Sequence, residues 1–331
     1  MNPSKFLSQT LFIFCVTLLL TGSYSNAQDI RYTQAYNAPL RLNPALMARN
    51  TAIKGILNYR SQWANIANGF TTYRFSFLYP LIMNEDQGKL DIGLSAINDQ
   101  AGVFNNLNIS LALSYSLRIS GDHHISAALM GGFAQTTVDP GDLTFDEQYV
   151  LGSFNTGNSN NELIVNETKN YPDLGTGLLW YFTPDENINA FAGVAVFHHN
   201  APNQSLTGQQ SDLSTSTNIH GGVKIIGDNF DVTPNVRFSQ QGGAEEYSLG
   251  ANIDYKINET MKIPVGLWYR YRGQNSFAAM LGFEHENFLV AYSYDLGSFT
   301  LIDAIPRSTT HEITLAFSVD QKEGNQVSSF E

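Results

Sequence analysis

Apolar and polar side chains alternate along most of this chain. In "NISLALSYSL", residues 108–117, every second residue from Ile109 to Leu117 is apolar, and the residues between them are serines and one alanine. The same pattern recurs in "EYSLGANIDYKI", residues 246–257, and in "TTYRFSFLY", residues 71–79. Because successive side chains of a strand point to opposite faces, a period of two predicts strands with one apolar and one polar face.

Fourteen segments of the chain carry a pattern of this kind, and an even number is typical of a closed bacterial barrel. The segments are 51–63, 71–79, 90–98, 106–119, 124–138, 174–183, 188–199, 213–226, 231–240, 245–257, 263–272, 276–285, 288–296 and 311–319. Their outward positions are too uniformly apolar and aromatic for a face in water, which disfavours a soluble all-β protein. The prediction is an all-β fold, a transmembrane outer-membrane β-barrel of about 14 antiparallel strands.

The connections between these segments support the same interpretation. If the N-terminus is periplasmic, the longest connections, 139–173, 200–212 and 297–310, all fall on the outer side. The connections of the other side are short, apart from the first, "PLIMNEDQGK". Short periplasmic turns and long outer loops are the usual asymmetry of such barrels.

The first 27 residues have the pattern of a secretory signal, with Lys5, an apolar run from Leu11 to Leu20 and a small-residue cleavage site before Gln28. The only cysteine, Cys15, lies inside that run, so the mature chain is expected to form no disulfide. The predicted organisation is a signal peptide (1–27), an irregular N-terminal plug or strap (28–50), the barrel (51–320) and a short periplasmic tail (321–331). The predicted location is the outer membrane of a Gram-negative-type cell.

The chain is acidic, with 18 Lys and Arg against 30 Asp and Glu, and Lys5 leaves with the signal segment. This balance argues against nucleic acid as a partner. No mature segment has the length of a transmembrane helix, and a closed sheet is the other structure that satisfies its backbone groups in lipid.

Three stretches resemble the PorP/SprF family of type IX secretion system membrane proteins. They are "QAYNAPLRLNPALMA" (34–48), "NYRSQWANIANGFTTYRFSF" (58–77) and "LVAYSYDLGSFTLIDAIPRSTTHEITLAFSV" (289–319), with a Tyr-Ser-Tyr-Asp strand, a long loop and a His-Glu-Ile strand in the last. Two departures are the absence of a glycine before Thr-His-Glu and the residues that follow the last strand.

The resemblance implies a component that supports export and cell-surface attachment of a large secreted protein, such as a gliding-motility adhesin, through its C-terminal sorting domain. The implied partners are that secreted protein, other type IX secretion components, a periplasmic peptidoglycan-linked partner and the lipid bilayer. No cofactor and no catalysis are expected. The alternative is an outer-membrane channel or transporter for small or hydrophobic solutes, and an outer-membrane hydrolase is a third, weaker reading.

The alternation places an unusual number of basic side chains toward the lumen. They are Lys54, Arg60, Arg74, Arg118, Arg237, Lys256, Arg270 and Arg272, with Asp254, Asp295 and Glu312 as the main inward acids. A barrel of 14 strands is too wide to be filled by its own side chains. We therefore expect Gln28–Asn50 to fold into or across the periplasmic mouth, its Asn and Gln side chains bonded to lumen arginines and Pro39 and Pro44 holding it extended; a strap outside the lumen is the alternative.

The outer loops carry the expected partner contacts. The candidate residues are Val150, Leu151, Phe154, Leu301, Ile302 and Ile305. Acids cluster in 139–173, but their spacing does not match an EF-hand loop, so partner contact is favoured over calcium. The pairs His123-His124 and His198-His199 invite a metal interpretation; adjacent strand residues point to opposite faces, which favours rim histidines and no metal site.

Overall fold

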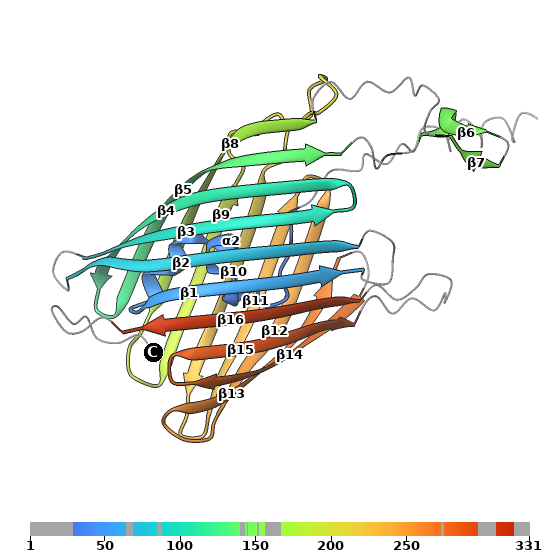
Figure 1. Cartoon of the computed structure of the whole chain (residues 1–331). Coiled ribbons are helices and arrows are strands. Elements are labelled where there is room, and N and C mark those ends of the chain that lie inside the picture. The colour runs from blue at the N-terminus through green and yellow to red at the C-terminus, as the bar shows by residue number, and fades with distance from the viewer. Residues whose placement is uncertain are drawn as a thin grey trace, which may run out of the picture.

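The computed structural model describes residues 29–63, 69–84, 88–139, 143, 145–150, 152–155, 167–272, 275–296 and 309–320. Fourteen of its strands form one closed antiparallel barrel (Figure 1). They are β1 (Ile53–Gln62), β2 (Phe70–Asn84), β3 (Gly88–Ala101), β4 (Phe104–Ser120), β5 (His123–Val138), β8 (Thr168–Phe182), β9 (Ile188–Phe197), β10 (Ser216–Ile226), β11 (Phe230–Gln241), β12 (Ala244–Lys256), β13 (Met261–Tyr271), β14 (Asn275–His285), β15 (Phe288–Leu296) and β16 (Thr310–Val319).

The barrel closes where its first and last strands pair. Ile53 of β1 lies opposite Val319 of β16, and Gln62 lies opposite Thr310. Every other strand pairs with its neighbours in the chain, except that β5 pairs directly with β8. The short strands β6 (Tyr149–Val150) and β7 (Ser153–Phe154) form a separate hairpin, preceded by the turn η4 (Asp146–Gln148), away from the barrel wall (Figure 1). The predicted closed barrel of 14 strands is confirmed.

Two strands, β8 and β2, extend five or more residues beyond one predicted end, each for an identifiable reason. β8 begins at Thr168 instead of 174, because polar residues there continue to pair with β5, as Thr168 does with Thr137. β2 continues to Asn84 through Pro80, and its register against β3 shifts between Pro80 and Ile82. Proline has no N–H for the ladder, and a bulge accommodates it.

The two faces of the wall follow the alternation. On β4, Leu111 faces outward with 60% of its surface exposed, whereas Ser114 faces inward and is 1% exposed. An apolar outer face and a polar inner face are what a barrel in lipid requires. Within the residues that the structure describes, no helix combines the length and the apolar character needed to cross a membrane.

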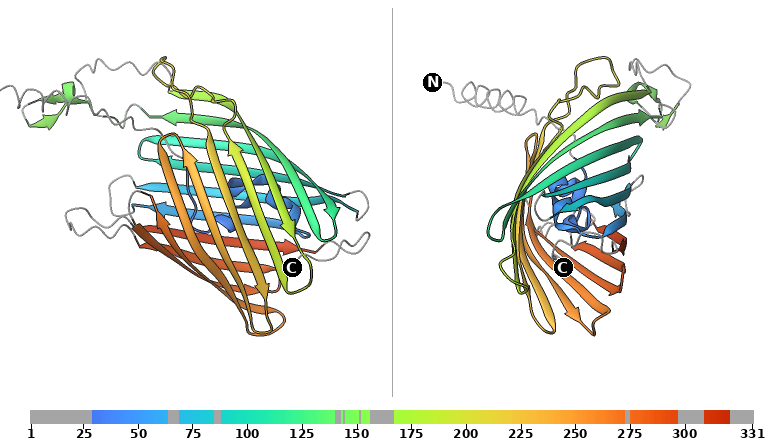
Figure 2. Two further views of the ribbon diagram at one scale, coloured as in Figure 1. Left: turned by 180° about the vertical axis from the view of Figure 1, so that it is seen from behind. Right: turned by 90° about the vertical axis from the view of Figure 1, so that its left-hand side faces the viewer.

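Residues 29–50, hereafter the plug, lie inside the barrel (Figure 2). They form three short helical turns, η1 (Ala35–Asn37), α2 (Pro39–Leu42) and η2 (Pro44–Arg49). The predicted extended geometry at Pro39 and Pro44 is wrong, because each proline begins a helical turn, where its missing N–H costs nothing. Asn43 caps η2, its Oδ1 accepting from the N–H of Ala45 at 2.9 Å.

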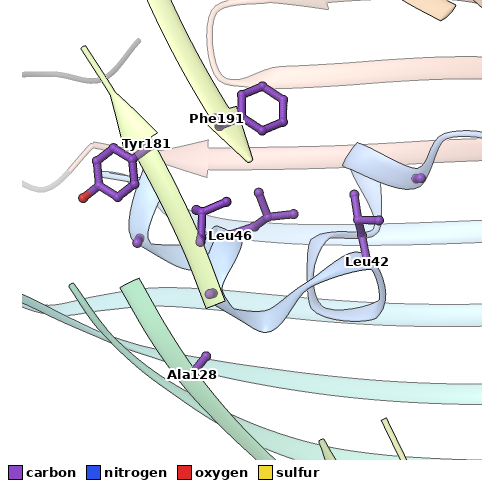
Figure 3. Packing of buried hydrophobic residues seen from close by; sticks show 9 residues of the cluster. Leu42, Leu46, Ala128, Tyr181 and Phe191 are labelled. Carbon is purple, nitrogen blue, oxygen red and sulfur yellow. The ribbon is translucent and has the colours of Figure 1, made fainter. Parts of the chain in front are cut away.

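The apolar core lies between the plug and the inner wall. In the larger cluster, Leu42 and Leu46 of the plug pack with Ala128, Tyr181 and Phe191 of the wall (Figure 3). In a second cluster, Leu40 and Met47 pack with wall residues. The buried apolar faces of its helical turns therefore hold the plug against the wall.

Candidate functional site

The plug spans the lumen from one end of the barrel to the other. We call the end with the connections 139–167, 198–215 and 297–309 the long-loop end, and the opposite end the short-turn end. At the long-loop end, the N–H of Asp29 donates to Oε1 of Gln241, the last residue of β11, at 2.6 Å. At the short-turn end, Nζ of Lys89 donates to the carbonyl oxygens of Met47 at 3.0 Å and Ala48 at 2.9 Å. The positive charge of Lys89 thereby complements the partial negative charge of the last carbonyl oxygens of η2.

A clamp on strands β15 and β16 holds the plug at Thr33 and Gln34. The carboxylate of Glu312, which is 0% exposed, accepts the backbone N–H of Thr33 at 2.9 Å and that of Gln34 at 3.0 Å. The Thr33 hydroxyl donates to Asp295 at 2.7 Å, and Nε2 of Gln34 donates to the hydroxyl of Ser293 at 3.2 Å. We call Ser293, Asp295 and Glu312 the plug clamp. A buried carboxylate that accepts two N–H groups is a strong, directional contact.

Basic side chains of the wall balance the acids of the clamp. Arg270 pairs with Asp295 at 2.5 Å, and Nε of Arg60 lies 3.9 Å from Glu312. All four side chains are buried. Buried charges are tolerated only when paired, so removing one member leaves another uncompensated.

Other inward side chains donate hydrogen bonds to the main chain of the plug. Nη1 of Arg237 donates to the carbonyl oxygen of Tyr32 at 3.1 Å, and Nη1 of Arg74 donates to that of Ala38 at 3.4 Å. Nδ2 of Asn58 donates to the carbonyl oxygen of Asn37 at 3.3 Å. For Arg74 and Arg237, the predicted partners, Asn and Gln side chains of the plug, are therefore wrong: both arginines bond to the main chain instead. Tyr32 lies before the first helical turn, and the carbonyl oxygen of Ala38, the N-cap of α2, accepts from Arg74 in addition to the N–H groups of Arg41 and Leu42.

Asn43 anchors the middle of the plug. Its side chain is fully buried, and Nδ2 donates to the carbonyl oxygen of Leu178 at 2.9 Å and lies 3.1 Å from Nε2 of His220. The approach is close because the wall carries glycines there: a Cβ on Gly177 would overlap Oδ1 of Asn43, and one on Gly193 would lie 2.6 Å from its Nδ2. Glycine is needed at such backbone contacts.

A charged cluster ties down the first residue of the plug. His198 lies between two carboxylates, with Nε2 2.8 Å from Asp29 and Nδ1 2.7 Å from Asp173, and Arg41 also pairs with Asp29. Burial opposes the charge on His198, but Asp29 and Asp173 outweigh it and raise the pKa of His198 to about 9. Burial likewise opposes the charge on Asp29, yet Arg41 and His198 hold the pKa of Asp29 well below its ordinary value. We call Asp29, Arg41, Asp173 and His198 the end latch.

The structure brings most of the predicted lumen cations together around the plug. Arg60, Arg74, Arg237 and Arg270 contact the plug or its clamp, as described above, and Lys54 lines a cavity beside it. Lys256 pairs with Asp231 at 2.7 Å, and Arg272, partly exposed at the rim, pairs with Glu246 at 2.7 Å. Arg118 does not line the lumen: its side chain is 56% exposed at the β4–β5 turn and pairs with Asp122. A register shift between Arg118 and Ser120 ends the alternation on which its inward placement was based.

The predicted outer-loop contacts are only partly within the described residues. Val150 and Phe154 lie on the β6–β7 hairpin and are exposed. Leu151, Leu301, Ile302 and Ile305 lie outside the described residues. The histidine pairs behave differently from one another: the His123 ring stacks on Phe182, the His124 ring stacks on Tyr181, and His199 contacts the Thr176 hydroxyl at 2.6 Å. Over the described part of the chain, no group of three or more His, Cys, Asp or Glu could hold a metal ion.

The sequence interpretation missed four residues at the contacts between the plug and the wall. The sequence could have indicated Asn43, because Asn is a preferred N-cap residue and Pro is favoured at the first position of a helix. Nothing in the sequence indicates the role of Gly177 and Gly193, because a glycine in a strand does not show which side chain packs against it. The alternation predicts Lys89 in a turn, whereas β3 begins at Gly88 and so includes it.

Comparison with known proteins agrees with this architecture. A family model described as type IX secretion system membrane protein PorP/SprF matches residues 24–317. No curated protein matches the chain.

Similar solved structures include a Pseudomonas aeruginosa FadL homologue (TM-score 0.55, 10% identity, covering 84% of this chain and 92% of that one). They also include the Ralstonia pickettii toluene transporter TbuX, with a TM-score of 0.52 and 11% identity over 90% of this chain and 96% of that one. A third is the Pseudomonas putida toluene transporter TodX, with a TM-score of 0.52 and 8% identity over 88% of this chain and 94% of that one. At these identities the likeness concerns the fold, an outer-membrane barrel, and not the transported solute. The family match over nearly the whole barrel and plug shows that this chain, an outer-membrane protein, belongs to the PorP/SprF family of type IX secretion system membrane proteins.

Proposed function

We propose that this barrel supports export and cell-surface attachment of a large, adhesin-like protein by holding its C-terminal sorting domain at the outer face. The barrel acts as a docking component and carries out no chemistry of its own. A periplasmic, peptidoglycan-linked partner then anchors the short-turn end.

The observation that carries this proposal is the occupied lumen. The plug contacts the wall from Gln241 at one end to Lys89 at the other, and the plug clamp binds its backbone. The clamp residues Ser293, Asp295 and Glu312 lie in one of the three stretches that resemble the family, and the plug is another. A lumen filled by a built-in segment favours docking over passage of a secreted polypeptide.

The long-loop end offers a surface for such docking. On the β6–β7 hairpin, Tyr149, Val150 and Phe154 are exposed, and the Tyr149 and Phe154 rings pack edge to face with centroids 5.0 Å apart. Exposed aromatic and aliphatic side chains on a loop are typical of partner contacts. We therefore assign the sorting-domain contact to this hairpin.

A channel for small or hydrophobic solutes is the second proposal. It is favoured by the space that remains beside the plug, a cavity of about 250 Å³ at the short-turn end. Passage would still require the plug to move.

A pulldown in mild detergent tests the first proposal. The tagged barrel is compared with a Val150→Ser/Phe154→Ser variant and with Ile257→Ser, which changes an exposed apolar residue at the opposite end of the barrel. Mass spectrometry is expected to identify a very large secreted protein with a C-terminal sorting domain, retained by Ile257→Ser and depleted at least tenfold by the hairpin variant. Heat-dependent migration on gels checks that every variant is folded.

The two proposals give opposite results. Recovery of the barrel without secreted cargo, together with solute-selective swelling of liposomes, would reject docking and support the channel. Equal cargo recovery by the hairpin variant would reject the assignment of the contact to β6–β7.

A further inference from the structure

A cavity of about 250 Å³ lies between the plug and the wall. Its polar wall residues place it at the short-turn end: Lys54 is the second residue of β1, and Glu284 is the residue before the last of β14. On the inner side it is bounded by Gln34, Tyr36 and Arg49 of the plug. Neither the plug contacts nor the proposed docking role uses this space.

One side of the cavity is apolar. Trp268, Met280 and Leu289 line it and belong to one packed cluster with Ala291. The Trp268 ring is fixed, because its Nε1 donates to Oδ1 of Asn235 at 3.2 Å. Well-packed aromatic and aliphatic walls with few polar groups are typical of sites for small molecules.

The other side of the cavity carries two cations that form no salt bridge with the described residues. Among the residues that the structure describes, neither Arg49 nor Lys54 lies within ion-pair distance of a carboxylate, and the Arg49 guanidinium sits over the Phe191 ring at 4.1 Å. The remaining charged residues of the lining differ. Lys224 pairs with Asp231 and Glu284 with Lys262, both at 3.5 Å, which leaves Asp254 as the one lining acid without such a pair.

We infer that this cavity binds a small amphiphilic acid, with its carboxylate between Arg49 and Lys54 and its apolar body against Trp268, Met280 and Leu289. A carboxylate would give these two partly buried cations a directly hydrogen-bonded counter-charge, which no described residue supplies, and charge-assisted hydrogen bonds are stronger than neutral ones. Pockets of about 300–1,000 Å³ take drug-sized molecules, so this cavity suits a smaller ligand of about eight to twelve non-hydrogen atoms. A bare inorganic anion would leave the apolar side unused.

Quenching of Trp268 fluorescence tests the inference directly. The protein in nanodiscs carries Trp63→Phe and Trp180→Phe, which leave Trp268 as the single tryptophan of the three. The probes are 8-bromooctanoate, neutral 8-bromooctanol and inorganic phosphate. The matched variants in this background are Arg49→Gln/Lys54→Gln and, as a control for loss of a distant positive charge, Lys169→Gln on β8.

We expect saturable quenching by 8-bromooctanoate, with the dissociation constant raised about tenfold or more by Arg49→Gln/Lys54→Gln and unchanged by Lys169→Gln. Quenching that does not saturate, or that the double variant leaves unchanged, overturns the inference. So does equal affinity for 8-bromooctanol, or competition by phosphate at the same concentration as the acid. An unchanged emission maximum of Trp268 in the double variant shows that the cavity wall is intact.

Discussion

Replacing Glu312 removes the acceptor on which the front of the plug depends. Glu312 receives the backbone N–H groups of Thr33 and Gln34 at 2.9 and 3.0 Å inside the barrel. In Glu312→Ala both donors stay buried with no partner from residue 312. In Glu312→Gln one oxygen remains, so one of the two N–H groups keeps an acceptor.

The size of the effect follows from these two bonds. Each buried N–H left without a partner costs about 1–3 kcal/mol. Glu312→Ala is therefore expected to weaken docking of the front of the plug by about 2–6 kcal/mol, and Glu312→Gln by about 1–3 kcal/mol. At 1.4 kcal/mol per tenfold change, the alanine variant opens the front of the plug about 30-fold more often at the least, and the glutamine variant about fivefold.

Cysteine labelling measures this opening. A cysteine at Ala35, which is buried beside the clamp, reacts with a maleimide only when the front of the plug detaches, so the labelling rate follows the opening equilibrium. The control is Glu245→Gln, which changes an exposed glutamate whose carboxylate accepts a hydrogen bond from the Tyr247 hydroxyl. Labelling of the alanine variant within threefold of the Glu245→Gln rate would refute the clamp as a determinant of docking.

Three further predictions concern the same lumen. Deleting residues 29–48 removes nearly the whole plug and should raise single-channel conductance in planar bilayers from near zero to a steady open level; an unchanged closed pore contradicts the plug assignment. The end latch should loosen as pH rises through about 9, because protonated His198 stabilises the docked plug. This stabilisation is fully present below the ordinary His pKa of 6.5 and is lost as pH rises through the raised pKa of about 9. The labelling rate of a cysteine at Ile30, divided by that of a surface cysteine at the same pH to remove the pH dependence of the thiolate, should therefore rise above pH 9. His198→Gln should abolish this rise, and a pH-independent ratio would contradict the latch. Gly177→Ala should weaken plug docking by about 1–3 kcal/mol through its overlap with Asn43, whereas Gly131→Ala, whose Cβ would meet only Leu174 at 3.6 Å, should behave like the parent in the same assay.

The wall of the barrel could be predicted because each of its elements is local. In a strand such as β4, outward residues such as Leu111 are apolar and inward residues such as Ser114 are polar. This alternation depends only on which face meets lipid, so consecutive residues show it. The limits of this reasoning appear where a strand leaves the membrane. Thr168 of β8 pairs with β5 although no apolar alternation marks it, and Arg118 leaves the lumen face where the register shifts.

The candidate site was predicted in its composition but not in its contacts. Arg74 and Arg237 were expected inside the lumen and lie there, yet they bond to main-chain carbonyls of Ala38 and Tyr32. Which atoms of the plug meet these arginines depends on how the plug folds inside the lumen. A period of two cannot disclose that, because the plug has no regular period.

The sequence by itself determined the barrel, its strand number, its membrane location and its family, since these follow from local alternation and from motifs that are contiguous in the chain. Only the tertiary structure decided that Thr33 and Gln34 meet Glu312, and that His198 joins Asp29 to Asp173. Each of these contacts joins a plug residue to a wall residue more than 160 positions away, except that between His198 and Asp173. The physical reason is closure: the barrel brings distant strands around one lumen, and the charges that face it choose partners by proximity there, not by position in the chain.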